Sequence, residues 1–229
     1  MKNHRQPFKT MVRLASTGLI ICFFAFFWTI SGHAAEISLP LVVIQTSMGT
    51  IEIELNPEKA PNTVSNFLQY VNSHFYDGTV FHRVIWRFMI QGGGYTKEME
   101  LKKTHPPIAI ESNNGLKNDK GTVAMARTGD PNSATSQFFI NAKDNDFLNY
   151  SRSTRQEYGY TVFGRVVQGM DVVNKIESVQ TASFMGMNDV PVTPVIIEKV
   201  FVKSSEIPSV AQHLRPSEKE PLAKERPQR

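Results

Sequence analysis

One arginine stands in an apolar stretch that has the pattern of a β-strand. Residues 81–94 read FHRVIWRFMIQGGG, and their alternation predicts Phe81, Arg83 and Ile85 on one face. A guanidinium keeps its charge and offers five donors in a rigid fork, so on an apolar face it must find acceptors or reach solvent. Two interpretations therefore stay open: a structural arginine paired with a core carboxylate, or a donor positioned for a ligand.

A second stretch places an amide beside an aromatic ring. Residues 124–141 read AMARTGDPNSATSQFFIN, which predicts a strand, a loop at 128–135 and a second strand. Gln137 and Phe139 fall on one face of that second strand, and Phe138 and Ile140 fall on the other. A face with an amide and an aromatic ring fits a peptide-binding groove as well as it fits a barrel wall.

Together, the two stretches resemble the motifs of cyclophilin-type peptidyl-prolyl isomerases, FHRV followed by FM.QGG and then SQFF. The matching residues are Phe81, His82, Arg83, Val84, Phe88, Met89, Gln91, Gly92, Gly93, Ser136, Gln137, Phe138 and Phe139. Two motifs of this length in the right order are far more specific than a short glycine motif. The similarity extends over about residues 41–203. Within the family, the chain most resembles the exported bacterial members.

The resemblance implies a mainly β fold, a closed eight-stranded antiparallel barrel capped by two helices, with substrate bound on its outer wall. It implies a cofactor-independent enzyme that acts on proline-containing unfolded or extended polypeptides. In the catalytic roles it places Arg83, which would stabilise the twisted amide, and Gln91, which would hold Arg83 and the substrate carbonyl. The substrate-binding positions that it implies are Phe88, Met89, Ala126, Arg127, Gln137, Phe139, Phe147, Leu148 and Tyr160.

Three departures from the family pattern affect these expectations. Trp86 and Arg87 stand where the family usually has Pro-Gly, so the bend before Phe88 is expected to differ. Tyr160 stands where many members have histidine, which removes a titrating group and keeps an aromatic wall. Phe147 stands where cyclosporin-sensitive members have tryptophan, and the missing indole N–H predicts weak cyclosporin binding.

The elements that must position these residues can be read from the periodicity. Residues 41–45 and 50–55 alternate as strands around a turn at 47–49. Apolar residues spaced by three and four after Pro61 predict a helix, and residues 169–177 predict a shorter one. The apolar residues of the first helix are Val64, Phe67, Leu68 and Val71. Residues 160–167 and 195–202 predict two further strands.

The first 34 residues have the composition of a secretory signal peptide. Four basic residues precede an apolar run at 19–30, and small residues precede a cleavage point after Ala34 or Ala35. An uncleaved anchor is the alternative, but the apolar run is shorter than the roughly 18 to 20 residues that span a bilayer. The sequence therefore predicts an isomerase domain at 36–203, a periplasmic location and no stable membrane association after cleavage.

Charge and cysteine content exclude several classes of function. Loss of residues 1–34 removes four of the 25 basic and none of the 21 acidic residues, which leaves no excess of positive charge for nucleic acid. The single cysteine, Cys22, lies in the predicted signal peptide, so the mature chain has no thiol chemistry. The histidines lack metal-ligand spacing, and no metal site is predicted. Residues 204–229 are predicted to be a disordered polar tail or, alternatively, a partner-binding arm.

Two other functions remain open beside catalysis by a monomer. The groove could hold proline-containing segments as a non-catalytic chaperone module. The chain could also be a structural subunit recruited through residues 204–229. The joint presence of Arg83, Phe88, Met89, Gln91 and Phe139 favours the enzyme.

Overall fold

The computed structural model describes residues 39–151 and 158–203, in which β-strands predominate. Eight strands form the barrel: β1 (Leu41–Thr46), β2 (Gly49–Leu55), β3 (Thr79–Ile85), β4 (Met89–Thr96), β5 (Thr122–Met125), β6 (Phe138–Asn141), β7 (Val162–Gln168) and β10 (Ile196–Val202). The other elements are α1 (Pro61–Asn72), the short 3-10 helix η1 (Asp146–Leu148), α2 (Met170–Glu177), β8 (Thr181–Phe184) and β9 (Met187–Pro191). The predicted signal peptide at 1–34 and tail at 204–229 lie outside the described residues.

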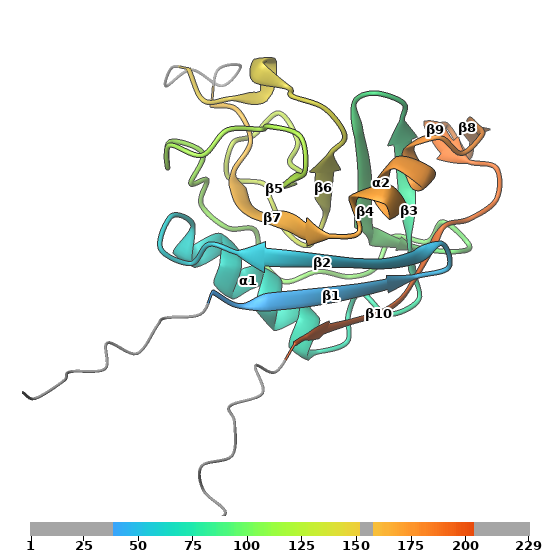
Figure 1. Cartoon of the computed structure of the whole chain (residues 1–229), viewed down its shortest axis with the longest axis horizontal. Helices are drawn as coiled ribbons and strands as arrows, with labels where there is room; N and C mark the ends of the chain where they lie inside the picture. The colour runs from blue at the N-terminus through green and yellow to red at the C-terminus, as the bar shows by residue number, and fades with distance from the viewer. Residues whose placement is uncertain (1–38, 152–157, 204–229) are drawn as a thin grey trace, which may run out of the picture. The chain divides into compact units, whose positions relative to one another are not determined.

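The eight strands close into a barrel in which every pairing is antiparallel (Figure 1). Around the barrel the order is β1, β10, β3, β4, β6, β5, β7 and β2, which returns to β1. Closure leaves none of these strands with an unpaired edge, the feature that invites aggregation in open sheets. The predicted closed eight-stranded barrel with two helices is confirmed.

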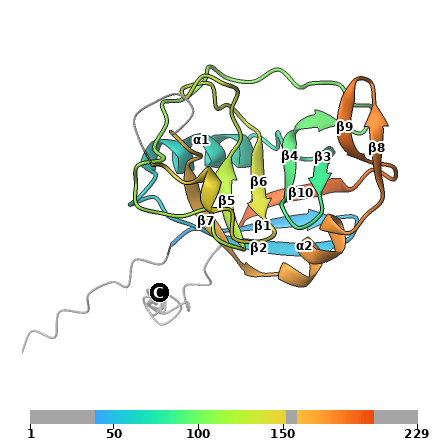
Figure 2. The ribbon, with the colours of Figure 1, turned by 90° about the horizontal axis from the view of Figure 1, so that it is seen from above.

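Helix α1 fills one side of the barrel with apolar side chains. Val64, Phe67 and Val71 are buried as their spacing predicts, and Leu68 packs against the edge of the same core. The ring of Phe67 contacts three rings of the interior, those of Tyr76, Phe138 and Phe163. Helix α2 lies on the opposite side of the barrel (Figure 2). Within the described ranges, no helix is both long and apolar enough to cross a bilayer.

Strand β3 contains a bulge that changes which side chains share a face. Phe81 pairs with Gly92 and Arg83 pairs with Gln91, so two residues of β3 advance against one of β4. As a result Phe81 packs in the barrel interior, while Arg83 lines the outer wall. The prediction that Phe81 shares the face of Arg83 is therefore wrong, because the alternation does not continue through a bulge.

Strand β4 passes close to its neighbours through three successive glycines. A Cβ atom at Gly93 would lie 2.8 Å from Cε1 of Tyr76, and one at Gly94 would lie 2.6 Å from Cγ of Gln137. Gly93 also has a φ of +83°, which side chains rarely adopt. The three glycines lie inside β4, where they make room for the interior rings and for Gln137.

Strands β8 and β9 form a hairpin that the sequence pattern did not predict. The hairpin lies beside β3 in both ribbon views (Figures 1 and 2). Its turn contains Met185 and Gly186, both with positive φ, and Asp189 in β9 has a φ of +63°. Most of β8 is exposed, so it lacks the alternation of buried and exposed residues from which a strand is predicted.

Candidate active site

Most of the predicted site residues line one cavity on the outer wall of the barrel. The cavity has a volume of about 110 Å³, and strands β3, β4 and β6 supply one side of it. Its lining residues are Arg83, Phe88, Met89, Gln91, Ala126, Arg127, Phe139, Leu148 and Tyr160. We call this space the proline cavity, after the ring that the family resemblance predicts it to hold. The sequence thus predicted residues that the fold brings together from segments more than 70 positions apart.

The floor of the proline cavity is apolar. Met89, Phe139 and Leu148 are buried and belong to a cluster that is separate from the barrel interior. The ring of Tyr160 meets Phe139 edge to face, with 5.5 Å between the ring centroids. Phe139 faces outward while Phe138 and Ile140 pack inward, as the alternation predicts. The floor can therefore receive a small apolar ring.

Phe147 lies at the margin rather than in the lining. Its side chain is 71% exposed, and its ring stacks on Phe88 with 5.6 Å between centroids. Because Phe88 lines the proline cavity, Phe147 extends the aromatic surface outward from it. Gln137 likewise does not line the proline cavity but the pocket beside it.

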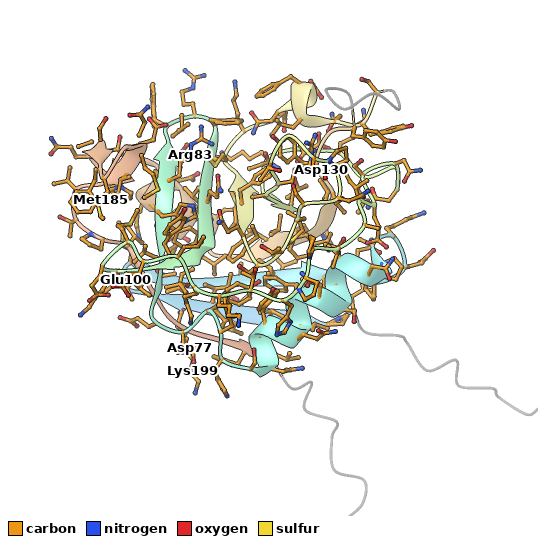
Figure 3. The ribbon with its side chains drawn as sticks, turned by 180° about the vertical axis from the view of Figure 1, so that it is seen from behind. Asp77, Arg83, Glu100, Asp130, Met185 and Lys199 are labelled. Atoms are coloured by element: carbon orange, nitrogen blue, oxygen red, sulfur yellow. The ribbon has the colours of Figure 1, made fainter. Side chains whose placement is uncertain are left out.

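Arg83 lies at the polar rim, in the upper part of Figure 3. It stands opposite Gln91 in the register of β3 and β4. Its Nε is 3.7 Å from Oδ2 of Asp189, and the two side chains are 42% and 38% exposed. The partner carboxylate is thus on the surface hairpin and not in the core. Sequence reasoning missed Asp189 because the hairpin that carries it was not predicted.

The side chain of Gln91 bonds a second amide, and its expected role in holding Arg83 stays a prediction. Its Nε2 donates to Oε1 of Gln137 at 2.9 Å, and in the described part of the chain no hydrogen bond joins it to Arg83. The two amides therefore form a bridge from β4 to the residue before β6. Gly94 makes this bridge possible, because Gln137 occupies the space where a Cβ would lie.

Arg127 closes the far edge of the proline cavity with its side chain. Its Nε donates to the Gly159 carbonyl at 2.8 Å and its Nη1 to the Thr128 carbonyl at 2.9 Å. The guanidinium also lies over the ring of Tyr160, 4.7 Å from its centroid. The Ala126 N–H donates to the Gln137 carbonyl at 2.9 Å, so this amide is engaged within the barrel and cannot also bind a peptide.

His82 lies beside the catalytic candidates but is buried. Burial lowers the pKa of His82 to about 4, and hydrogen bonds with Val80 and Gln137 offset only part of that effect. Among residues 39–151 and 158–203 its Nδ1 has no hydrogen-bond partner, and its ring lies 4.6 Å from that of Tyr95. The imidazole is therefore neutral at pH 7, and the positive charge at this rim belongs to Arg83.

The turn that joins β3 to β4 closes without proline or glycine. The Phe88 N–H donates to the Ile85 carbonyl at 3.1 Å, and Arg87 has a φ of +51°, a value that glycine adopts easily. The Arg87 N–H donates to the carboxylate of Glu177 at 2.9 Å, which ties the turn to α2. This contact fixes the bend before Phe88, and the expected difference from a Pro-Gly bend stays a prediction.

A chain of buried amides beneath the cavity was missed by sequence reasoning. Nδ2 of Asn145 donates to the Phe88 carbonyl at 3.0 Å and to Oδ1 of Asn141 at 2.8 Å. Asn141 donates in turn to Asn118, and Nδ2 of Asn118 donates to the Leu148 carbonyl. The chain thus fixes the backbone of two residues that line the proline cavity. Isolated asparagines in a sequence read as turn residues, so only the fold reveals this role.

The groups available for chemistry here are the guanidinium of Arg83 and the amides of Gln91 and Gln137, which lie beside an apolar cavity. Among the described residues no group of three or more His, Cys, Asp or Glu side chains could hold a metal ion. A donor at the rim can stabilise charge or a lone pair that develops in a bound molecule. An extended peptide with a small apolar ring fits that arrangement.

Comparisons with known proteins agree with this geometry. The model of the family described as "Cyclophilin type peptidyl-prolyl cis-trans isomerase/CLD" matches residues 41–202. The peptidyl-prolyl cis-trans isomerase cyp18 of Streptomyces antibioticus is 60% identical over 157 residues, which cover 69% of this chain and 95% of that protein. Peptidyl-prolyl cis-trans isomerase B of Escherichia coli is 55% identical over 162 residues, which cover 71% of this chain and 99% of that protein.

Solved structures show the same similarity. A cyclophilin type peptidyl-prolyl cis-trans isomerase of Cryptosporidium parvum matches with a TM-score of 0.60 at 28% identity, over 73% of this chain and 99% of that chain. A structure of that isomerase in the presence of the dipeptide Ala-Pro matches with a TM-score of 0.59 at 28% identity, over 72% of this chain and 99% of that chain. Because the family model covers well over half of the chain and the relatives match over nearly their whole length, the chain belongs to the cyclophilin-type peptidyl-prolyl cis-trans isomerases.

Proposed function

We propose that Arg83 is the group with which this isomerase accelerates rotation about X-Pro peptide bonds. Two guanidinium groups line the proline cavity, but that of Arg127 is bonded to two backbone carbonyls. Arg83 has only the contact of its Nε with Asp189, so among the described residues its Nη groups have no hydrogen-bond partner. This free, oriented donor beside an apolar cavity is the observation that carries the proposal.

The reaction needs a donor and no nucleophile. Rotation is slow because the C–N bond has partial double-bond character, with a barrier of about 18–20 kcal/mol. When the amide twists, conjugation is lost and the prolyl nitrogen regains a lone pair that can accept a hydrogen bond. Donation from Arg83 to that lone pair is available only in the twisted state, so it stabilises the transition state over both ground states.

The free energy of this hydrogen bond determines how much of the rate acceleration must come from other parts of the site. A hydrogen bond from a charged donor contributes about 1.5–3 kcal/mol, which corresponds to about one to two decades of rate. The rest comes from holding the proline ring on the dry floor formed by Met89, Phe139 and Leu148. The bridged amides of Gln91 and Gln137 then orient the neighbouring carbonyl of the peptide.

Arg83→Ala tests this assignment with a short Ala-Pro peptide. We expect the wild-type chain to accelerate cis-to-trans exchange and the variant to lose at least one decade of kcat/KM. Val167→Ser, a change of an exposed residue of β7 on the opposite side of the barrel, serves as the control that keeps the activity. Circular dichroism shows whether each variant is folded. An Arg83→Ala variant that stays folded and fully active overturns the proposal.

The same experiment separates catalysis from simple holding of proline-containing segments. The exposed ring of Phe147, stacked on Phe88 at the margin of the cavity, favours some retention of apolar segments. If the wild-type chain binds the peptide without accelerating exchange, the groove is a binding module. Retained binding with loss of exchange in Arg83→Ala instead supports catalysis.

We further propose that the substrates are unfolded or extended exported proteins and that the chain acts as a periplasmic monomer. The support comes from the composition of residues 1–34, in which a basic leader precedes an apolar run. Mass spectrometry of the chain recovered from a periplasmic fraction tests the location and the cleavage after Ala34 or Ala35. Light scattering tests the monomer, and cyclosporin titration tests the weak binding expected from Phe147.

A further inference from the structure

The β8–β9 hairpin and strand β3 enclose a second cavity, which we call the hairpin cavity. Its volume is about 240 Å³. Apolar side chains make up most of its wall, among them Val80, Met99, Phe184, Val190, Val192 and Pro194. Phe184 and Val192 are 52% and 57% exposed, so the mouth of the cavity offers apolar surface to solvent.

A polar pocket of about 380 Å³ joins the hairpin cavity to the proline cavity. It shares His82 with the former, and it shares Arg83 and Gln91 with the latter. Asn188 and Asp189 of the hairpin complete its wall. The three spaces therefore adjoin one another through shared wall residues, and we call this row of spaces the groove. Its lining changes from apolar to polar and back to apolar.

The length of this groove can be estimated from β3. Val80 lines the hairpin cavity and Arg83 lines the proline cavity, and three residues of a strand span about 10 Å. An extended substrate that lies along β3 covers the same distance with three residues. Figure 3 shows the hairpin, which carries Met185, beside strand β3, which carries Arg83.

We propose that the hairpin cavity binds an apolar side chain of the polypeptide substrate, about three residues from the proline that is isomerised. This inference rests on the proposed function, because the groove begins at the proline cavity. The polar pocket between them suits the backbone groups of the intervening residues, to which its amides and carboxylate can bond. The hairpin thus selects, among proline-containing segments, those with an apolar residue at that distance.

The size and continuity of the hairpin cavity favour this occupant. A space of about 240 Å³ admits one leucine or phenylalanine side chain. In an unfolded polypeptide, apolar side chains are exposed at many different distances from a proline, whereas a folded protein keeps most of them in its core. Burial of one leucine side chain in such a site strengthens binding by about five- to tenfold once incomplete enclosure is allowed for.

Peptides with one proline test the inference. A serine-rich host peptide carries a fluorophore, one Ala-Pro unit and one leucine, which is moved from the second to the fifth position on either side of the proline. Fluorescence anisotropy gives Kd for each peptide with the purified full chain, and NMR exchange gives the isomerisation rate. We expect leucine near the third position on one side to bind about five- to tenfold more tightly than serine there.

Three variants show whether the hairpin is responsible. Phe184→Ser and Val192→Ser should each abolish most of the gain from leucine, and both should isomerise a short Ala-Pro peptide at the wild-type rate. Val167→Ser, an exposed valine of β7, should keep the whole gain. A gain that is equal at all positions of leucine, or that survives both hairpin variants, overturns the inference.

Arg83→Ala separates failure of this inference from failure of the proposed function. Loss of exchange with a retained leucine gain supports both proposals. Unchanged exchange in that variant contradicts the role of Arg83, while the dependence of Kd on leucine position and on Phe184 still decides the role of the hairpin.

Discussion

Arg83 has a neighbour on either side that the barrel itself supplies. Gln91 stands across the strand pair, and Asp189 approaches from the hairpin. At 3.7 Å and with both side chains well exposed, the ion pair contributes little to folding stability. In the role proposed for Arg83, this contact would hold Nε and leave the terminal nitrogens available to the substrate.

Asp189→Asn should therefore lower kcat/KM by about two- to fivefold without changing the unfolding free energy, because the guanidinium loses orientation rather than charge. Proline isomerisation assays at low and high salt measure this, since salt should affect the wild type more than the variant. In the Arg83→Ala background the same substitution should have no further effect. An equal loss in both backgrounds would show that Asp189 acts on the substrate directly.

His82 should make the stability of the fold depend on pH. The unfolded chain takes up this proton near pH 6.5 and the folded chain only near pH 4, so between these values the unfolded chain binds more protons. The contribution of His82 is complete above pH 6.5 and declines as the pH falls toward 4. At pH 5 the loss is about 2 kcal/mol relative to pH 7.

Urea unfolding of His82→Gln at pH 7 and pH 5 measures this contribution. Relative to the wild type, the variant should lose about 2 kcal/mol less on acidification, because glutamine does not titrate. Val167→Ser, a change of an exposed residue that does not titrate, should show the same pH dependence as the wild type. Parallel pH dependence of all three proteins would refute the assignment.

Among the elements, strand β4 shapes the site through its glycines, because the space that their side chains would take is filled by neighbouring residues. The Gln91–Gln137 bridge exists because Gln137 occupies the position that a side chain at Gly94 would take. Gly94 has no positive φ, so alanine there is limited by space and not by backbone conformation. A methyl group at this position would therefore displace the side chain of Gln137 and leave the backbone conformation of β4 unchanged.

Gly94→Ala should move Gln137 and break the amide bridge, which lowers kcat/KM by about three- to tenfold, equivalent to about one hydrogen bond. The crowding should cost about 1–3 kcal/mol of stability. Gly129→Ala is the matched control, because Gly129 has open space around its Cβ position and no positive φ. Assays and thermal unfolding of both variants check this, and similar activity in the two would contradict it.

How much could be predicted from the sequence depended on how regular each strand is. In β6 the alternation held, and Phe139 was placed correctly opposite Phe138. In β3 the bulge at His82 broke the alternation, because the bulge is set by the register with β4 and leaves no local signal. Asp189 and the buried Asn145 were missed for a related reason: their roles depend on contacts with residues distant in the chain.

For the barrel as a whole, the packed interior supports the strands whose outer faces carry the site. Phe67 of α1 contacts rings from three separate segments of the interior, and its side chain is fully buried. One of these, Phe138, directly precedes the cavity residue Phe139 in β6. Interior packing and the site are therefore coupled through the position of strands and not through shared contacts.

Phe67→Ala should lower the unfolding free energy by about 3–5 kcal/mol, because the cavity that it leaves is enclosed by several rings and cannot collapse. At temperatures where the variant remains folded, kcat/KM should change by less than about twofold, since the outer wall keeps its strand register. Calorimetry and isomerase assays at several temperatures measure the two effects. A variant that loses activity well below its unfolding transition would show that the proline cavity depends on interior packing in detail, and that the barrel is not a rigid support for it.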